Sequence, residues 1–371
     1  MVQTQIRHGV RGTVAVFLPN WIGDAAMATP ALRSLAASRS DRGHLIGILR
    51  PYIREVLAGT EWLDEFIEYE PNRAGRRRLT ATLRARSIDT ALLLTNSFST
   101  AWIAWRGGIR RRIGYRGDGR AWLLTDPLTR VRHRGRRLPR SAVDDYLDLV
   151  RVLGIVPDTP RLELHVTPEE RQRGAAIWSQ LGLGTRPVIA FHPGAAYGSA
   201  KCWPPDAFAR LADQLVEQLD TDILVLCGPG ERDIARTIER SASTDHIVSL
   251  AEAGLSIGQT KALLQQCRML VTTDSGPRHL AAGLGIPTVA LFGSTDPRWS
   301  GNYHPLERRL EIELDCRPCG RRACPLQHHR CMTELHPELV ADAVAAWWQE
   351  PGSVPCGHST WPRPASTRLA G

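Results

Sequence analysis

Asp24 is a lone carboxylate that follows the segment LPNWIG (residues 18–23) near the start of the chain. The segment comes directly after an apolar run typical of a strand, and it leads into Ala, Leu and Met residues at helical spacing. An aspartate at such a helix start is often a cap. At the open edge of a sheet, the same carboxylate could instead accept a proton from a substrate hydroxyl, as a general base does.

A second segment, HPGAAYGSAKCWP (residues 192–204), follows another apolar run. Its small residues, Gly194 among them, allow a backbone to approach a ligand closely, and Lys201 supplies a point charge suited to phosphate. Lys201 and Lys261 are the only lysines among 47 basic residues. A chain that uses arginine almost everywhere has thus kept a lysine here, which favours a phosphate contact at Lys201.

Two further turns have the composition of phosphate sites. In TTDSGPRHL (residues 272–280) a strand ends and Pro277 opens a helix, whose free N–H groups and positive dipole end suit a diphosphate. An ordinary turn capped by one of its own side chains would have the same composition. The candidate binding residues of this turn are Asp274, Ser275, Gly276, Arg278 and His279. In GPGER (residues 228–232), Gly228 marks the turn and Glu231 could bind ribose hydroxyls.

The elements around these segments predict an α/β protein. Short continuous apolar runs alternate with helical stretches in both halves, as in doubly wound parallel sheets whose ligands bind beyond the carboxyl ends of the strands. We expect two Rossmann-like domains that face each other across a cleft. The expected boundaries are residues 1–165 for the first domain, 166–187 for a linker, 188–336 for the second domain, 337–350 for a C-terminal helix and 351–371 for a disordered tail.

Charge is concentrated in one part of the sequence. Residues 71–140 contain eighteen arginines and three aspartates, within a chain whose net charge is +9. Such a segment attracts nucleic acid, a phosphorylated substrate or an anionic membrane surface, although a GC-rich genome would also favour arginine. No run is long enough for a membrane span and no secretory leader is evident, so we expect a cytoplasmic protein.

Four of the eight cysteines form the pattern C-x2-C-x4-C-x6-C: Cys316, Cys319, Cys324 and Cys331. This spacing could supply the ligands of a tetrahedral structural zinc or iron site. Reduced thiols or cross-links are the alternative that we favour.

Taken together, LPNWIGDAAMATPALRSL, HPGAAYGSAKCWP, GPGER, TTDSGPRHLAAGLGIPTVALFGSTDP and CPLQHHRCM resemble the lipopolysaccharide heptosyltransferases of glycosyltransferase family 9, most closely the heptosyltransferase II branch. The resemblance runs from about residue 14 to residue 348. It implies a GT-B fold and an inverting, cofactor-free and metal-independent transfer of L-glycero-D-manno-heptose from ADP-heptose to the heptosyl-Kdo2-lipid A inner core, at the inner-leaflet surface of the membrane.

The resemblance also implies roles for single residues. Asp24 matches the base, Lys201 the lysine that steadies the diphosphate, and Glu231 the ribose carboxylate. Two positions depart from the family pattern, where Cys202 replaces a basic residue and Arg278 an apolar one. We expect Arg278 to replace the missing cation beside the diphosphate.

Two alternatives remain at this point. One is a GT-B transferase that uses another nucleotide sugar, or a protein or other glycan as acceptor. The other is a non-catalytic module that binds a nucleotide or nucleic acid; such a module would have no need of a carboxylate at Asp24.

Overall fold

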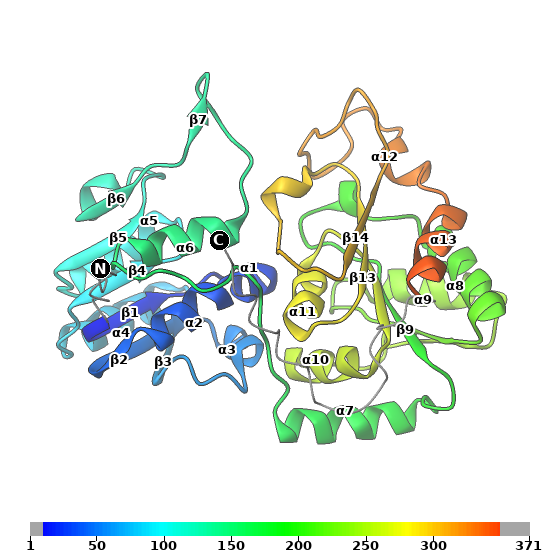
Figure 1. Ribbon diagram of the computed structural model, residues 1–371, viewed down its shortest axis with the longest axis horizontal. Helices are drawn as coiled ribbons and strands as arrows, with labels where there is room; N and C mark the ends of the chain where they lie inside the picture. Colours follow the sequence, from blue (N-terminus) through cyan, green and yellow to red (C-terminus); the bar gives the residue numbers. More distant parts are fainter. Residues whose placement is uncertain (1–9, 349–371) are drawn as a thin grey trace, which may run out of the picture.

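Two six-stranded sheets, one in each half of the chain, organise the fold (Figure 1). The computed structural model describes residues 10–348. The strand order is β3-β2-β1-β4-β5-β6 in the first sheet and β11-β10-β9-β12-β13-β14 in the second, and all neighbours are parallel. The strands of the first sheet are β1 (Val10–Phe17), β2 (Arg39–Leu49), β3 (Glu65–Glu68), β4 (Thr90–Leu93), β5 (Arg111–Tyr115) and β6 (Asp126–Leu128). Those of the second are β9 (Val188–His192), β10 (Asp222–Val225), β11 (Ile247–Ser249), β12 (Met269–Thr273), β13 (Thr288–Phe292) and β14 (Glu307–Glu311).

Both sheets are covered on two faces, which explains the continuous apolar runs of their strands. In β1, Val14 and Val16 point into one core while Ala15 and Phe17 point into another on the opposite face. The expected α/β class with doubly wound parallel sheets is therefore confirmed. In each sheet the strand order reverses beside the first strand, between β1 and β4 and between β9 and β12, and such switch points open the crevices in which ligands bind.

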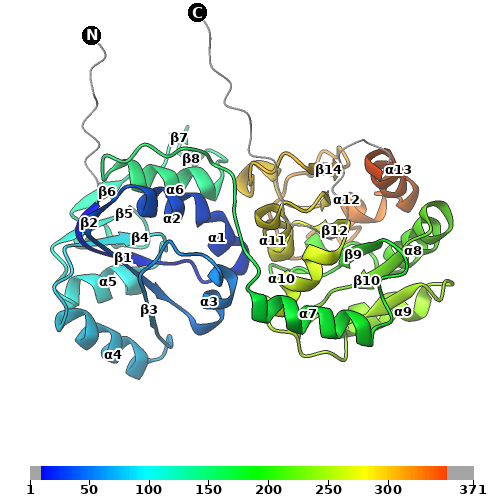
Figure 2. The same cartoon turned by 60° about the horizontal axis from the view of Figure 1, so that its bottom comes forward.

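Helices of the first domain fall into two layers (Figure 2). One layer contains α1 (Ile22–Met27), α2 (Thr29–Ala37), α3 (Pro51–Leu57) and α6 (Ala142–Arg151). The other contains α4 (Arg73–Arg84), capped by the Asn72 side chain, and α5 (Phe98–Arg106), capped by Ser97. A short 3-10 helix, η1 (Ala121–Leu123), lies beside α5, and the strands β7 (Arg132–His133) and β8 (Arg136–Arg137) form a projecting hairpin.

Helices of the second domain are also layered. On one face lie α8 (Pro205–Leu219), α9 (Arg232–Ser241) and α13 (Pro337–Trp348), and on the other lie α10 (Ile257–Gln266) and α11 (Gly276–Leu284). Three short elements complete the domain: η2 (Ser199–Lys201), η3 (Pro297–Trp299) and α12 (Arg330–Thr333). The predicted disordered tail and the last two residues of the predicted C-terminal helix lie outside the described residues.

The segment expected to be a linker contains a helix, α7 (Pro168–Gln180). Thr167 and Glu170 form a capping box at its start. The helix packs tightly on α10, since a Cβ atom on Gly174 would lie 2.6 Å from Ala262 Cβ. The expected linker, residues 166–187, is thus largely part of the second domain, and the chain crosses between the domains before it. The sequence does not reveal this helix, because its exposed, charged residues form no apolar stripe.

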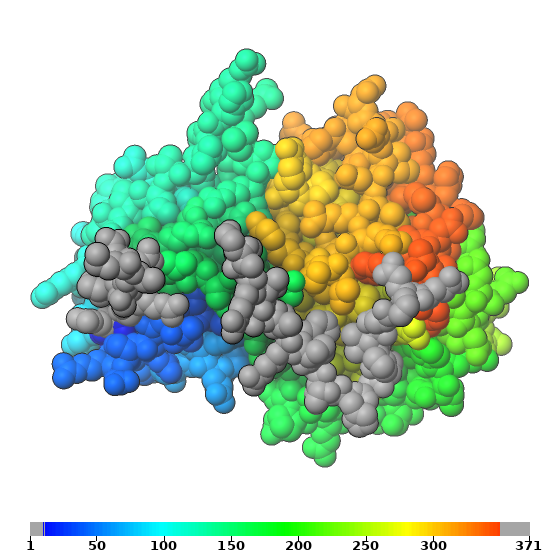
Figure 3. Space-filling model, in the orientation of Figure 1, coloured from blue at the N-terminus to red at the C-terminus, as the bar shows by residue number. Residues whose placement is uncertain are grey.

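The two domains abut along their shared boundary (Figure 3). One core is continuous from α2 and α3 of the first domain to α10 and α11 of the second. Lys261 of α10 is fully buried, and its ammonium donates to the backbone oxygens of Ala58 and His165, 3.2 and 2.8 Å away. The same ammonium lies 3.2 Å from a carboxylate oxygen of Glu170. Lys261 therefore joins both domains and the crossing segment, a structural role rather than a phosphate contact.

Candidate active site

Asp24 lies in the first turn of α1, just after β1 brings the chain to the sheet edge that faces the second domain. Trp21 occupies the N-cap position, and no side chain caps this helix end. Among the residues that the structure describes, none forms a hydrogen bond with the Asp24 carboxylate. Burial raises the pKa of Asp24 to about 6, although the positive charge of Lys201 opposes that rise. The structure thus assigns the carboxylate no capping role and leaves it available as a base.

The start of α1 is packed against the start of α11 in the other domain. A Cβ atom on Gly23 would lie 2.8 Å from Cδ2 of His279 and 3.4 Å from Cα of Gly276. Only a glycine permits this approach, so the contact depends on the residue next to Asp24. The predicted proton acceptor and the predicted diphosphate turn, which are about 250 residues apart in sequence, are therefore brought together across the domain boundary.

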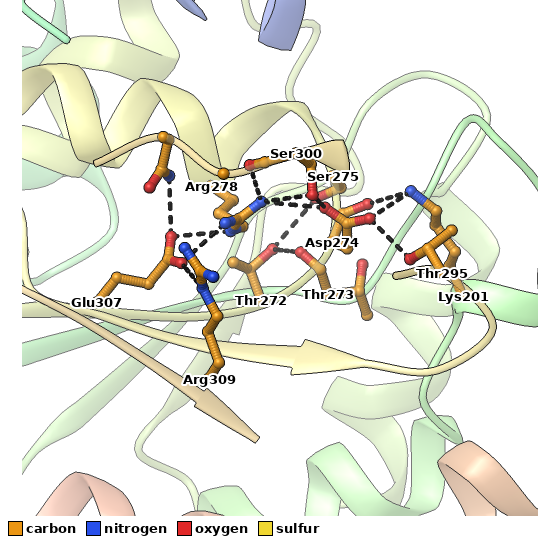
Figure 4. A network of polar contacts seen from close by, with 12 residues as sticks. Lys201, Thr272, Thr273, Asp274, Ser275, Arg278, Thr295, Ser300, Glu307 and Arg309 are labelled. Carbon is orange, nitrogen blue, oxygen red and sulfur yellow. Dashed lines mark hydrogen bonds and ion pairs between the residues drawn. The ribbon is translucent and has the colours of Figure 1, made fainter. Parts of the chain in front are cut away.

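Asp274 is the centre of a buried polar network at the end of β12 (Figure 4). Its Oδ2 accepts hydrogen bonds from Lys201 Nζ at 2.7 Å and from Thr295 Oγ1 at 2.8 Å. Its Oδ1 accepts from Arg278 Nη1 at 3.1 Å and from Ser300 Oγ at 2.8 Å. Burial alone would raise the pKa of Asp274, but the charges of Lys201 and Arg278 outweigh it and hold the pKa well below its usual range. An ionised, fully bonded carboxylate here positions the lysine rather than touching a phosphate itself.

Lys201 follows a glycine-rich loop that the sequence predicted to approach a ligand. Besides the Asp274 carboxylate, its ammonium donates to the Asp274 backbone oxygen at 2.9 Å. The ammonium also lies 4.9 Å from the centre of the Tyr197 ring. Its side chain is 12% exposed, so the charge is positioned but still reachable by an anion.

The first turn of α11 offers backbone N–H groups that have no partner within the helix. Ser275 occupies the N-cap position without a side-chain cap, and Gly276 begins the helix. The Ser275 hydroxyl lies 3.2 Å from Thr272 Oγ1 and 3.4 Å from His192 Nδ1. The capping alternative for Ser275 and Asp274 therefore does not hold, and the helix start remains a suitable anion site.

Arg278 does not occupy the role expected from the sequence. Its guanidinium is fully buried and binds Glu307 in a bidentate manner, with Nε–Oε2 and Nη2–Oε1 distances of 2.8 Å. The remaining Nη1 donates to Asp274 and to Ser300. All its nitrogens are thus occupied, and the structure supports a role for Arg278 in fixing the network rather than as a second cation at the diphosphate.

Glu231 brings a third loop to the same place. Its Oε2 accepts a hydrogen bond from the Gly228 N–H at 2.8 Å and lies 3.3 Å from His192 Nε2. A Cβ atom on Gly194 would overlap the Glu231 carboxylate, at 1.9 Å from Oε1. Burial opposes ionisation, but the His192 ring and the Gly228 N–H outweigh it and lower the pKa of Glu231. The structure therefore brings two of the predicted residues, Gly194 and Gly228, against the carboxylate of the third, Glu231.

His279 is buried at the contact between the two helix starts. Its Nδ1 has no hydrogen-bond partner among the described residues. Burial, and secondarily the charge of Arg278, lower the pKa of His279 to about 3, so the ring is neutral at physiological pH. The buried Nδ1 of this neutral ring is therefore an unused hydrogen-bonding atom beside the predicted diphosphate turn.

Metal ligands are not assembled anywhere in residues 10–348: no group of three or more His, Cys, Asp or Glu side chains is placed to hold an ion. Cys316, Cys319, Cys324 and Cys331 are free thiols.

Several residues of the site were not predicted. His192 orients Glu231, while Thr295, Ser300 and Glu307 complete the network around Asp274 and Arg278. Their types carry little signal, since hydroxyls and single carboxylates occur in most loops. The one available signal was position, because Thr295 follows β13 at the same sheet edge as the other loops.

A candidate base on one domain and a lysine with a helix start on the other define the class of two-domain transferases that move a group from a nucleotide. The family model "Glycosyltransferase family 9 (heptosyltransferase)" matches residues 76–330, more than half of the chain. The chain therefore belongs to glycosyltransferase family 9.

Comparison with individual proteins agrees with this assignment. The chain is 27% identical over 349 residues to lipopolysaccharide heptosyltransferase 2 of Escherichia coli (strain K12), covering 90% of this chain and 97% of that protein. The solved structure of E. coli ADP-heptose LPS heptosyltransferase II matches with a TM-score of 0.74 and 27% identity, covering 90% of this chain and 98% of the other. A glycosyltransferase family 9 structure from Veillonella parvula has a TM-score of 0.77 at 22% identity, covering 92% and 98%, and supports the fold. These matches confirm the GT-B fold and the resemblance to heptosyltransferases.

No helix within the described part of the chain is long and apolar enough to cross a membrane.

Proposed function

We propose that this glycosyltransferase moves L-glycero-D-manno-heptose from ADP-heptose to the lipid A-linked inner core of lipopolysaccharide, with inversion. The names of its relatives support the substrates: the E. coli protein is named lipopolysaccharide heptosyltransferase 2, and the name of the E. coli heptosyltransferase II structure includes ADP-heptose. The observation that carries the proposal is the Asp24 carboxylate, which has no hydrogen-bond partner among the described residues. It lies close enough to Lys201 of the other domain for the lysine charge to affect its pKa.

In this mechanism Asp24 removes the proton from the acceptor hydroxyl, whose oxygen forms a bond to the anomeric carbon of the heptose. The bond from that carbon to the diphosphate breaks, and ADP leaves with the electron pair. Lys201 and the N–H groups at the start of α11 stabilise the charge that develops on the departing diphosphate. A single displacement inverts the anomeric centre.

The other carboxylates near the site are unsuited to act as a covalent nucleophile. Asp274 accepts four hydrogen bonds from side chains, and Glu231 is held by His192 and Gly228. This leaves Asp24 as the reactive carboxylate and supports inversion rather than retention. We assign Gly194, Gly228 and Glu231 to the nucleoside side of the donor, and Ser275, Gly276 and His279 to its diphosphate.

We further propose that the reaction takes place on the cytoplasmic face of the inner membrane, where a lipid-linked acceptor is found. The arginine-rich first domain would then face anionic lipid and acceptor phosphates rather than nucleic acid.

The test is incubation of the purified chain with ADP-heptose and a lipid A-linked inner-core acceptor, with release of ADP measured. We expect ADP release that requires the acceptor and that falls by about a thousandfold or more in Asp24→Asn. The matched control is Asp118→Asn, an exposed aspartate at a positive φ that asparagine tolerates. Full turnover by Asp24→Asn would exclude Asp24 as the base.

The same assay separates the alternatives. Turnover with another nucleotide sugar, or with a peptide or a lipid-free glycan in place of the lipid acceptor, would assign a different transferase. Tighter binding of single-stranded DNA than of ADP-heptose, with no turnover of any sugar, would assign a binding module.

A further inference from the structure

Four large aromatic side chains form an exposed cluster on the first domain. Phe98, Trp102 and Trp105 lie at i, i+4 and i+7 of α5, and Trp122 of η1 joins them. Their exposed fractions are 39, 38, 40 and 63%. The opposite face of α5, with Ala101, Ile103 and Ala104, is the one that packs into the core. These rings are therefore surplus to the fold, and a contiguous exposed patch of this kind marks an interaction surface.

The rings contact each other rather than standing apart. Trp102 and Trp105 have their centroids 4.9 Å apart, and Trp122 lies 6.1 to 6.3 Å from the three rings of α5. Most of the pairs are tilted or edge-on, with interplanar angles of 44 to 74°. Ring faces that are partly covered by neighbouring rings offer poor platforms for stacked bases. The four rings instead form one apolar surface, three of them being indole groups of tryptophan.

Positive charge lies beside the cluster. Helix α4 packs beside α5 in the same outer layer (Figure 2). Neither helix contains a carboxylate, and together they expose Arg73, Arg76, Arg77, Arg78, Arg84 and Arg106. None of these arginines forms an ion pair with a residue in the described part of the chain. The face thus combines unpaired cations with apolar rings, which is the composition of a surface that lies on anionic lipid.

The cluster is rigidly tied to the edge of the sheet at which catalysis is proposed. The guanidinium of Arg120, which precedes η1, is fully buried and donates to the backbone oxygens of Thr95 at 2.7 Å, Tyr115 at 2.9 Å and Ser97 at 3.2 Å. It therefore fixes η1 to the start of α5. That start follows the carboxyl end of β4, the neighbour of β1, and β1 leads to Asp24. A membrane bound to this face would therefore lie beside the sheet edge that carries Asp24.

We infer that the α4–α5 face, with its Phe98, Trp102, Trp105 and Trp122 cluster, docks on a bilayer surface rich in anionic headgroups. The indole rings lie at the boundary between headgroups and acyl chains, where tryptophan is enriched in membrane proteins, and the arginines pair with lipid phosphates. The inference rests on the proposed function, because a lipid-linked acceptor is the reason for an enzyme of this kind to bind a membrane. Its test is independent of that function, because vesicle binding is measured without any sugar.

The test is co-sedimentation of the full chain with vesicles of phosphatidylcholine alone and of phosphatidylcholine mixed with phosphatidylglycerol. We expect binding to the mixed vesicles only, reduced about tenfold or more in a Trp102→Gln/Trp105→Gln variant and in an Arg76→Gln/Arg77→Gln variant. Matched controls are Leu339→Gln, an exposed apolar residue of α13, and Arg171→Gln/Arg173→Gln on α7, both of which should bind like the wild type.

Brominated acyl chains give a second measurement that does not depend on sedimentation. They should quench tryptophan emission of the wild type, and the quenching should be lost in Trp102→Gln/Trp105→Gln while its circular dichroism and unfolding midpoint stay unchanged. Equal binding by the aromatic variant and the wild type, binding to neutral and anionic vesicles alike, or single-stranded DNA that binds this face and displaces the vesicles would each overturn the inference.

If the wild-type chain binds the mixed vesicles but transfers no heptose, the proposed function is rejected and the docking surface is still supported. If both are correct, the aromatic variant should turn over a short, lipid-free acceptor at the wild-type rate and a vesicle-embedded acceptor more slowly.

Discussion

At the scale of single residues, two aspartates show how environment decides chemistry. The Asp24 carboxylate has no hydrogen-bond partner in the described chain, and its pKa is raised. The Asp274 carboxylate is surrounded by two cations and two hydroxyls, and its pKa is lowered. The sequence assigned both to the ends of strands but could not tell which would be free. The difference comes from residues far away in sequence, Lys201 and Ser300 among them.

The first prediction concerns the pH dependence of transfer. A base must be ionised, and the pKa of Asp24 in the folded chain is about 6. We expect kcat/KM of the free enzyme to fall about tenfold per pH unit below pH 6 and to level off above it. The measurement is kcat/KM from pH 4.5 to pH 8 with a pH-stable acceptor. A profile that stays flat down to pH 4.5 would contradict the assignment.

The second prediction is that Asp24→Asn stabilises the chain while it inactivates it. Because the folded state raises the pKa of this carboxyl, it binds the proton more tightly than the unfolded chain, so stability falls as the pH rises from about 4 to about 6. Removing the charge should add about 3 kcal/mol to the free energy of unfolding at pH 7.5 and less than about 1 kcal/mol at pH 4. Urea unfolding at both pH values measures it, and an equal gain at the two would point to a cause other than ionisation.

The third prediction concerns the network centre. Asp274→Asn removes the charge between Lys201 and Arg278, and we expect a loss of about 2–4 kcal/mol of unfolding free energy. Since the folded state lowers this pKa, the contribution is complete above about pH 4 and is lost only in stronger acid. Asp118→Asn is again the control. A wild-type urea midpoint for Asp274→Asn at pH 7 would show that the network does not depend on that charge.

At the scale of elements, the sequence predicts most strands and helices because buried parallel strands are continuous apolar runs. Strands β12 and β13 are such runs, and the C-terminal helix predicted over residues 337–350 begins at Pro337 as predicted. The strands β5 and β14 were missed because arginines interrupt their runs. Arg111 of β5 binds Asp126, and Arg309 of β14 binds Glu307, contacts that make a charged strand tolerable but that no local pattern reveals. Helix α5 was missed because both of its faces are apolar.

The loops of the candidate site were predictable because they follow strands that the sequence reveals as apolar runs. Loops after β1, β9, β10 and β12 were identified from the rule that ligands bind beyond strand ends, and the structure brings them together. The role of Arg278 was not predictable, because its partner Glu307 is 29 residues away and lies on a strand that the sequence did not reveal.

The fourth prediction belongs to α10. Lys261→Met keeps the length of the side chain but leaves two backbone oxygens and the Glu170 carboxylate without their donor, so we expect a loss of about 2–4 kcal/mol of unfolding free energy. Gln265→Met, at an exposed position on the same helix, should be neutral. Urea unfolding of both variants decides, and equal stability would show that the buried ammonium contributes nothing net.

At the scale of the whole molecule, the two domains share one apolar core, and Gly23 of the first domain packs against the start of α11 in the second. The close approach of Gly23 to α11 sets how near Asp24, the proposed base, lies to the proposed diphosphate turn. Catalysis by this chain therefore depends on the fit of two helix starts as much as on the reacting groups, since small displacements of a catalytic group are costly.

The fifth prediction tests that fit. The added methyl in Gly23→Ala would meet His279 Cδ2 at 2.8 Å and push the domains apart. We expect kcat to fall about a hundredfold while the affinity for ADP changes little. The control is Gly254→Ala, where a Cβ meets no atom within 4 Å. Wild-type kcat in Gly23→Ala would show that the reacting groups tolerate a wider separation.

The scarcity of lysine gives the chain a useful chemical property. Of its two side-chain amines, that of Lys261 is sealed from solvent and that of Lys201 is within reach of an anion. A phosphate-bearing aldehyde such as pyridoxal phosphate would therefore find one internal amine to label, and protection by ADP at the proposed diphosphate site could be measured by mass spectrometry on a single peptide.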